Sequence, residues 1–331
     1  MINRVCIPGA IFFLLVISSC AQELKSLELS NKLSILNDRA YFNFPDSAKN
    51  MARPVGIMSA DHNINKETRV LFDVGPKRLV FFAQELYRFS GDNFLEQILA
   101  EDNGEEQGIT GKVLSKETSL FSYLSVPGDF DSTLNAIFVS SLLVKTKDGS
   151  IFRVDAYINP AAYSLRNEYI SLVERIFTTL SPGKRKNLRE ARTEKLKIFG
   201  TKKSFVFEVP ENYSIAVDQK YDFQVFKFIK YRDYEDTSWV SLTIYVGSHP
   251  SMFHKEYGFE SATEMQTLDF LGKEVKCLYF ANKEKNLYLK EQQIPSDNIK
   301  NGLIVHIAMS SNRKELIDEL GGIATRIKLE Q

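Results

Sequence analysis

Hydrophobic and polar residues follow the same order twice along this chain. Each copy opens with a short alternating stretch that ends at a proline, Ala40–Pro45 in the first copy and Phe205–Pro210 in the second. Alternation with a period of two predicts a strand with one buried face, and the terminal proline is typical of a strand at the edge of a sheet. We therefore expect an edge strand at the start of each copy.

Each copy also closes with a strand followed by an amphipathic helix. The closing strands are predicted at Ile151–Ile158 and Leu303–Met309. In the segments that follow, apolar residues recur at three- and four-residue spacing, as on one face of a helix. These residues are Tyr169, Leu172, Val173, Ile176 and Leu180 in the first copy and Leu316, Leu320, Ile323 and Ile327 in the second. The halves share this pattern but few identical residues, so we interpret it as a structural repeat.

The stretches between these ends contain further strand candidates. They lie at Arg78–Leu86, Ser119–Val126, Ala136–Lys147, Asp222–Tyr231, Trp239–Val246, Glu274–Phe280 and Leu287–Glu291, with a short helix at Asn93–Ala100. Successive strands followed by a helix predict an antiparallel sheet packed against helices. The predicted fold class is therefore α+β, with two tandem antiparallel-sheet domains, each covered by helices and each ending in an amphipathic helix.

The N-terminus has the three parts of a secretory signal peptide. Arg4 precedes an apolar run at 7–17, and two serines lead from this run to Cys20. A run of this length is too short to cross a membrane, which takes about twenty apolar residues. The sequence therefore predicts an exported protein.

Two cleavage sites fit this segment. Residues 17–20, Ile-Ser-Ser-Cys, resemble a bacterial lipobox, whose cysteine receives diacylglycerol. The alternative is an ordinary signal-peptidase site after Ala21, which would release a protein that begins at Gln22. The favoured prediction is a periplasm-facing membrane lipoprotein that is lipidated at Cys20, and the alternative is a soluble periplasmic or secreted protein.

These patterns divide the chain into five segments. They are a signal peptide (1–20), an N-terminal tether (21–35), a first domain (36–182), a basic linker (183–197) and a second domain (198–331). Lys184, Arg185 and Lys186 in the linker are candidate contacts for phosphate headgroups or another acidic surface. The alternative is a solvated linker without a binding role.

Composition narrows the class of protein. The 331 residues include 42 Lys and Arg against 42 Asp and Glu, with 44% hydrophobic and 25% charged residues, as in a folded soluble protein. A neutral chain lacks the basic surface of nucleic-acid-binding proteins, so no nucleic-acid partner is predicted. Cys6 and Cys20 belong to the N-terminal segment, which leaves Cys277 alone in the mature body and predicts no internal disulfide.

The residue types that carry catalysis do not form a known motif. His249 and His254 are five residues apart with Pro250 between them, which does not match the HExxH spacing of a zinc site. His306 and Cys277 each alternate with apolar neighbours in a predicted strand, so we expect a hydrogen-bonded sheet histidine and a buried thiol. We predict no catalytic residue, no metal and no cofactor.

Aromatic residues are the remaining candidates for binding. Tyr231, Tyr234 and Trp239 belong to an aromatic-rich stretch at 221–239, and exposed aromatic residues are common in contact surfaces. The alternative is that they are present because aromatic residues are good strand formers.

Three stretches together resemble the PsbP-like domain. They are an opening strand of the form xFxFP, the strand WVSLTIYVG at 239–247, and the strand and helix FRVDAYINPAAYSLRNEYISLVERIFTTL at 152–180. The resemblance covers roughly 36–182 and 198–329, and it implies an α/β/α sandwich and a non-enzymatic, protein-binding or accessory role. It has no diagnostic catalytic motif, so it implies no functional residue.

The predicted function is that of a non-enzymatic exported lipoprotein that serves as a binding or accessory module of the bacterial cell envelope. Its expected partners are the membrane, through the lipid anchor, and another envelope protein. Two alternatives remain open from sequence: an immunity-like factor that neutralises a toxin in the periplasm, and a hydrolase with an unrecognised carboxylate site.

Overall fold

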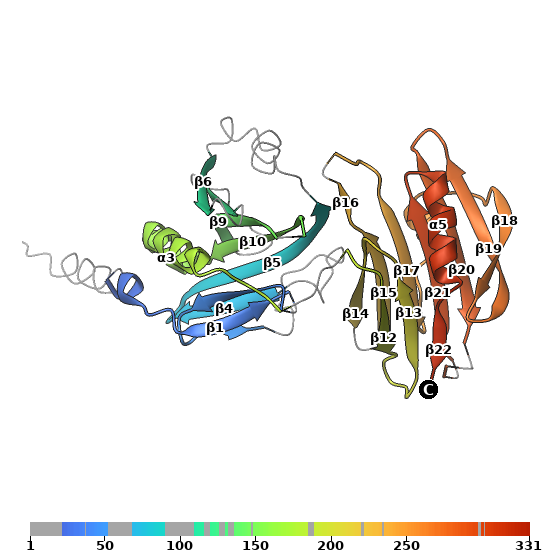
Figure 1. The fold of residues 1–331 in the computed structure, drawn as a ribbon, viewed down its shortest axis with the longest axis horizontal. Coiled ribbons are helices and arrows are strands. Elements are labelled where there is room, and N and C mark those ends of the chain that lie inside the picture. The colour runs from blue at the N-terminus through green and yellow to red at the C-terminus, as the bar shows by residue number, and fades with distance from the viewer. Residues whose placement is uncertain are drawn as a thin grey trace, which may run out of the picture.

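The computed structural model describes residues 22–331, with gaps at 37, 52–67, 90–108, 116–119, 126–129, 132–135, 147, 185–188, 220–221, 234, 297–298 and 301. Most of the described residues lie in strands, which form two large and two small sheets (Figure 1). Neighbouring strands of the described chain pair antiparallel, except for one short parallel pair between β5 (Lys77–Phe89) and β16 (Arg232–Asp233).

The first half of the chain contains one large and one small sheet. The large sheet has the order β3-β4-β5-β10-β9-β7-β6, with β8 paired to β9. Its strands are β3 (Lys49–Asn50), β4 (Thr68–Val74), β5 (Lys77–Phe89), β6 (Ile109–Ser115), β7 (Leu120–Ser125), β8 (Phe130–Asp131), β9 (Ala136–Lys145) and β10 (Ser150–Ile158). The small sheet consists of β1 (Asn31–Ile35), β2 (Ala40–Phe44) and β11 (Ser181–Pro182). Two helical segments, the 3-10 helix η2 (Pro160–Leu165) and α3 (Arg166–Thr178), follow β10.

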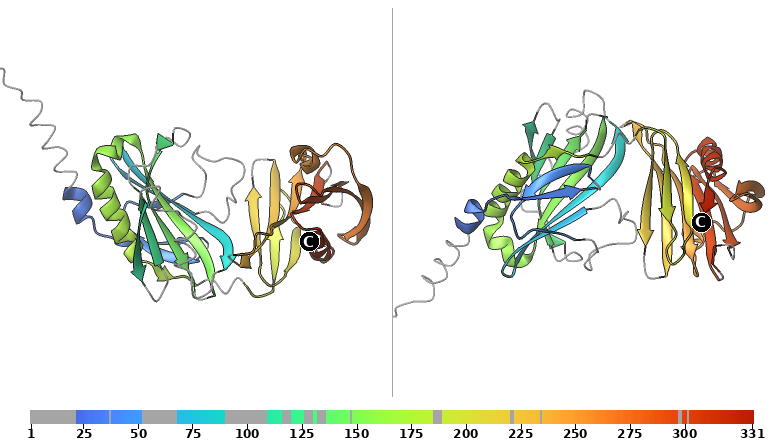
Figure 2. Two further views of the ribbon diagram at one scale, coloured as in Figure 1. Left: turned by 90° about the horizontal axis from the view of Figure 1, so that it is seen from above. Right: turned by 60° about the horizontal axis from the view of Figure 1, so that its bottom comes forward.

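Aromatic side chains join the layers of this half. Phe81 on the large sheet packs against Phe44 of the small sheet at 5.2 Å and against Phe177 of α3 at 6.2 Å between ring centroids. Phe42 on the small sheet also contacts Phe177. One face of the large sheet is therefore covered by α3 and the small sheet together, and Figure 2 shows α3 lying across it.

The second half repeats this arrangement. Its large sheet has the order β14-β15-β17-β21-β20-β19-β18 and its small sheet the order β12-β13-β22. The strands are β12 (Arg192–Lys197), β13 (Ser204–Val209), β14 (Tyr213–Gln219), β15 (Phe223–Lys230), β16 (Arg232–Asp233), β17 (Val240–Gly247), β18 (Glu264–Phe270), β19 (Lys273–Asn282), β20 (Leu287–Pro295), β21 (Ile304–Ser311) and β22 (Lys328–Glu330). The helices are the one-turn α4 (Phe253–Glu256) and α5 (Lys314–Ala324). The small sheet and α5 again share a core with the large sheet, through contacts such as Phe207 with Phe228.

The predicted α+β class, with helix-covered sheets, is wrong: the described chain is mostly β-sheet. The first core is closed by α3, η2 and a three-stranded sheet, and the second by α5 and a three-stranded sheet. The hydrophobic pattern did not predict the small sheets, because several of their strands are polar or very short. β12, for example, reads RTEKLK and alternates between half-buried and exposed side chains. Because β12 spans Arg192–Lys197, the C-terminal part of the predicted linker is a strand.

The opening strands exist, but their predicted edge position is also wrong. β2 lies between β1 and β11, and β13 lies between β12 and β22. Pro45 and Pro210 follow the last residue of these strands, so the missing N–H groups do not interrupt the ladders. The other predicted strands and the two amphipathic helices are confirmed, while the predicted helix at Asn93–Ala100 lies outside the described residues.

Candidate functional site

A buried histidine–glutamate cluster lies on the outer face of the second large sheet. Alternation along β21 places Val305 and Ile307 in the core and His306 on the opposite face. Glu291 on the neighbouring β20 lies on that same outer face, and α4 supplies His254. We call His254, Glu291 and His306 the histidine–glutamate cluster.

The Glu291 carboxylate, which is 1% exposed, accepts every polar contact in this cluster. The backbone N–H groups of Phe253 and His254 donate to it at 3.1 and 3.0 Å. The ring nitrogens His254 Nδ1 and His306 Nε2 lie 2.5 and 2.9 Å from its oxygens. Burial raises the pKa of Glu291, but the hydrogen bonds from His306 and His254 outweigh it and hold that pKa below its ordinary value.

Aromatic rings surround these polar contacts. The ring of His254 stacks on Phe280 at 4.9 Å with an interplanar angle of 8°, and Phe253 packs on His306 at 5.5 Å. Phe280 belongs to a small second core on this face, together with Leu289, Ala308 and the partly buried Phe253, Tyr257, Phe259 and Leu278. The histidine–glutamate cluster therefore binds α4 to the outer face of the sheet.

This geometry has one feature in common with catalytic histidines. A buried carboxylate that binds Nδ1 orients a histidine as in general-base catalysis, and the side chain of His254 is 16% exposed. Within the described residues, however, no hydroxyl or thiol is hydrogen-bonded to His254, and no three His, Cys, Asp or Glu side chains have the geometry of a metal site. The contacts that the structure shows for this cluster hold α4 on the outer face of the sheet.

Prediction from sequence found part of this cluster. The expectation that His306 is a hydrogen-bonded sheet histidine is confirmed by its contact with Glu291. The link between His254 and Glu291 was missed, because the two residues are 37 positions apart and no spacing rule joins them. His254 makes its ring contacts with Glu291 and Phe280 rather than with His249.

A second feature, the β12–β13 turn, lies at the solvent-exposed end of the small sheet. Ile198 is buried in the core, whereas the next residue, Phe199, is 45% exposed. The buried side chain of Gln224 fixes the backbone between them, since its Oε1 accepts from the N–H of Phe199 at 2.9 Å and its Nε2 donates to the carbonyl of Lys197 at 3.1 Å. Gly200 has φ +68°, a left-handed conformation that glycine adopts without strain. The turn is therefore a fixed structure that presents a phenyl ring to solvent.

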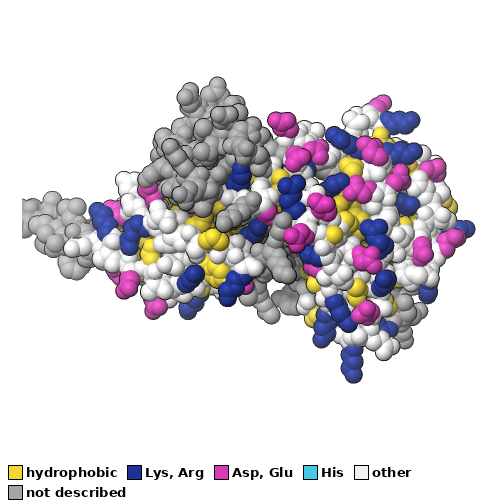
Figure 3. All heavy atoms as spheres, in the orientation of Figure 1, with side chains coloured by type: hydrophobic (Ala, Val, Ile, Leu, Met, Phe, Trp, Pro, Cys, Tyr) yellow, Lys and Arg dark blue, Asp and Glu magenta, His cyan; other side chains and the backbone are white. Residues whose placement is uncertain are grey.

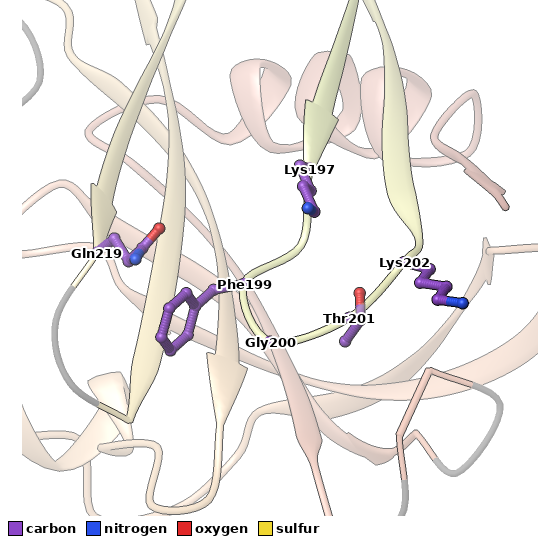
Figure 4. Close-up of a pocket in the computed structure, with 6 residues that line it drawn as sticks. All are labelled: Lys197, Phe199, Gly200, Thr201, Lys202 and Gln219. Atoms are coloured by element: carbon purple, nitrogen blue, oxygen red, sulfur yellow. The ribbon is translucent and has the colours of Figure 1, made fainter.

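An open cavity of about 560 Å³ adjoins this turn (Figure 4). Its lining residues are Lys197, Phe199, Gly200, Thr201, Lys202 and Gln219. A Cβ added at Gly200 would lie 3.9 Å from Lys300 Nζ, so a third lysine reaches the turn from the β20–β21 connection. We call this cavity and its three lysines the β12–β13 pocket. Its ammonium, hydroxyl and amide groups are suited to an anionic ligand.

The first half of the chain has a buried charged cluster of its own. Arg39 Nε lies 2.9 Å from Glu85 Oε1, and the Arg39 guanidinium also donates to the hydroxyl groups of Thr146 and Ser150. Burial raises the pKa of the neighbouring Asp148, but hydrogen bonds from Thr146 and Ser150 hold it below its ordinary value. These contacts join the start of β2 to β5 and to the β9–β10 connection, so the cluster has a structural role.

The residues that the sequence nominated for binding do not form one site. Tyr231 is 2% exposed and packs between the two halves, stacked on Phe89 at 5.1 Å and 5.3 Å from Tyr87. Trp239 is half-buried beside β17, where its backbone N–H donates to Asn312 Oδ1. Lys184 is exposed.

Of the other residues named from the sequence, one has the predicted burial and four lie outside the residues that the structure describes. Tyr234, Arg185, Lys186 and Cys20 are outside the described residues. Cys277 is buried in the second core as predicted, and burial raises the pKa of its thiol. The sequence did not single out Phe199, whose only signal is a position between lysines in KIFGTKK at 197–203.

Comparison with protein-family models, curated proteins and solved structures gives no significant match. The resemblance to the PsbP-like domain therefore stays a prediction. Among the described helices, none has the length and apolar composition that a membrane crossing requires.

Proposed function

We propose that this protein is an exported, non-enzymatic binding module of the bacterial cell envelope, anchored by a lipid at Cys20. The N-terminal sequence supports export, with its apolar run at 7–17 and lipobox-like residues at 17–20. The observation that carries the binding role is the β12–β13 pocket, which is open to solvent and lined by lysine side chains and one exposed phenyl ring.

The contrast with the histidine–glutamate cluster supports a binding role over an enzymatic one. Both oxygens of the buried Glu291 carboxylate are hydrogen-bonded, and among the described residues no hydroxyl or thiol is hydrogen-bonded to His254. A reactive centre needs a nucleophile or an activated water beside its general base. The β12–β13 pocket, in contrast, combines accessible donors with a fixed backbone, which lowers the entropy lost on binding.

The anchor is tested by fractionation of cells that produce wild-type protein or Cys20→Ser. The membrane fraction is washed at high salt, which removes protein held by charge alone. Wild-type protein is expected to remain in the washed membranes and to incorporate labelled fatty acid, and Cys20→Ser is expected to be released. If wild-type protein incorporates no fatty acid and the variant resists the wash, the lipoprotein assignment fails.

The non-enzymatic role is tested by activity screens on the purified protein with ester, phosphoester, peptide and glycoside substrates. We expect no turnover. Reproducible turnover that is abolished by His254→Gln, but not by a substitution at the exposed His249, would overturn the proposal and favour a hydrolase.

A further inference from the structure

We infer that the β12–β13 turn docks on an anionic phospholipid surface, with Phe199 inserted among the headgroups and Lys197, Lys202 and Lys300 against their phosphates. This inference rests on the envelope location proposed above. It adds a contact that is separate from the lipid anchor, because it is made by the folded C-terminal half.

Phe199 is held in a position from which it can insert. Its side chain is 45% exposed, and its backbone is fixed by the buried Gln224 amide. The hydroxyl of Thr201 closes the turn by donating to the carbonyl of Ile198 at 3.0 Å. A ring presented on a fixed backbone loses little conformational entropy on binding, which favours a small contact.

The charges around the ring match an anionic surface. The β12–β13 pocket includes no carboxylate, and Lys197, Lys202 and Lys300 form no ion pair with any described residue. Figure 3 shows Lys and Arg side chains projecting at the lower end of the C-terminal half, close to the C-terminus. Lysine ammonium groups within a Debye length of anionic headgroups are attracted to them.

The combination of one exposed ring and three lysines favours a lipid bilayer over an acidic protein as the binding partner. A stable protein–protein interface buries on the order of 1,000 Å² or more, which one turn with a single exposed ring does not supply. A membrane interface needs no complementary partner surface, because an aromatic ring inserts at the headgroup boundary while lysines remain at the phosphates.

The exposed Met265 provides a comparison within the same half. It is 62% exposed on β18, and its neighbours in sequence are Glu264 and Gln266. An exposed apolar side chain outside the β12–β13 pocket is expected to add nothing to the binding of anionic vesicles.

The experiment measures sedimentation of the chain from residue 21 onward with vesicles of phosphatidylcholine, with or without phosphatidylglycerol. This chain is suitable because both hydrophobic cores consist of residues from Leu24 onward. We expect binding to phosphatidylglycerol vesicles that weakens as salt is raised. Lys197→Gln and Lys202→Gln should each weaken it about fivefold, and Phe199→Ser about tenfold.

Matched variants distinguish the contribution of the β12–β13 turn from that of charged and apolar side chains elsewhere on the surface. Lys273→Gln and Lys276→Gln remove exposed lysines of β19, and Met265→Ser removes an exposed apolar side chain. These variants should bind like wild-type protein. Phe199→Trp adds a spectroscopic measurement. The fluorescence of this variant should shift to the blue on vesicles, whereas that of wild-type protein, which comes from Trp239 alone, should not.

Three results would overturn the inference. They are absence of binding to phosphatidylglycerol vesicles, an equal loss in the matched variants, and competition by polyglutamate with no effect of Phe199→Ser. The last result would indicate an acidic protein partner instead. None of them bears on fatty-acid labelling of Cys20, so failure of this inference is distinguishable from failure of the proposed anchor.

Discussion

Replacement of Glu291 by glutamine tests the structural account of the histidine–glutamate cluster. Glutamine has nearly the same shape, but one carboxylate oxygen becomes an NH₂ group that donates rather than accepts. Four N–H groups face the carboxylate, from two backbone positions and two imidazole rings. At least one of them therefore loses its acceptor in Glu291→Gln, and the rest lose their bond to a charge.

The expected cost follows from the burial of this site. Hydrogen bonds to charged groups contribute about 1.5–3 kcal/mol each, and a buried donor left without an acceptor costs about 1–3 kcal/mol. Because Glu291 is 1% exposed, solvent does not replace the lost partners. We expect Glu291→Gln to lower the free energy of unfolding of the C-terminal half by about 3 kcal/mol.

The assay is urea denaturation followed by the fluorescence of Trp239, the single tryptophan, which lies in the C-terminal half. The pH dependence gives a second reading. Because the pKa of Glu291 in the folded protein lies below its ordinary value of 4.5, its contribution is complete above that pH and is lost as pH falls through the folded pKa. The difference between wild-type protein and Glu291→Gln should therefore be largest at neutral pH and shrink below about pH 4.5.

Glu274→Gln provides the control, because Glu274 is an exposed carboxylate on β19 of the same sheet. It should change the free energy of unfolding by less than about 0.5 kcal/mol. The reasoning is refuted if Glu291→Gln costs no more than this control at neutral pH, or if its cost is the same on both sides of pH 4.5.

Three further predictions concern other parts of the chain. Tyr231→Ala should destabilise the contact with Phe89 by about 3 kcal/mol and speed proteolysis between the halves, whereas Tyr231→Phe keeps the ring and should not; equal behaviour of the two would contradict the packing role. Glu85→Gln should remove the nearer of the two carboxylates that face the buried Arg39, with Asp148 remaining at 3.9 Å, and cost about 1.5–3 kcal/mol in denaturant unfolding; a cost below about 1 kcal/mol would show that the pair is not needed. Cys277, which is buried with a raised thiol pKa, should react with a thiol reagent only after denaturation, and rapid labelling of the native protein would contradict its core position.

The hydrophobic pattern was sufficient to predict a strand or helix where one face of that element is buried. The alternation of the two opening stretches and the apolar stripe of α3 both predicted which side chains enter the cores. It was insufficient for strands such as β12, whose charged residues give little hydrophobic signal and whose place is set by pairing with β13. That pairing is long-range information, so the small sheets and the true fold class were not predictable from local pattern.

The sites were less predictable than the strands. Glu291 and His254 meet only because β20 and the segment before β18 share one face of the sheet. Tyr231 belonged to an aromatic-rich stretch that suggested a contact surface, yet the pairing of β16 with β5 buries it between the halves. Phe199 shows the reverse case, because an aromatic residue next to a buried Ile198 is left exposed by the turn.

Binding through the β12–β13 turn is the role that we propose for this protein. Site-specific photo-crosslinking in cells tests it most directly, with a benzophenone amino acid at position 199 and, as the control, at the exposed position 265. The account predicts adducts with envelope phospholipid from position 199 and little from position 265. Equal labelling from both positions, or no adduct from position 199 in protein that is correctly exported, would contradict it.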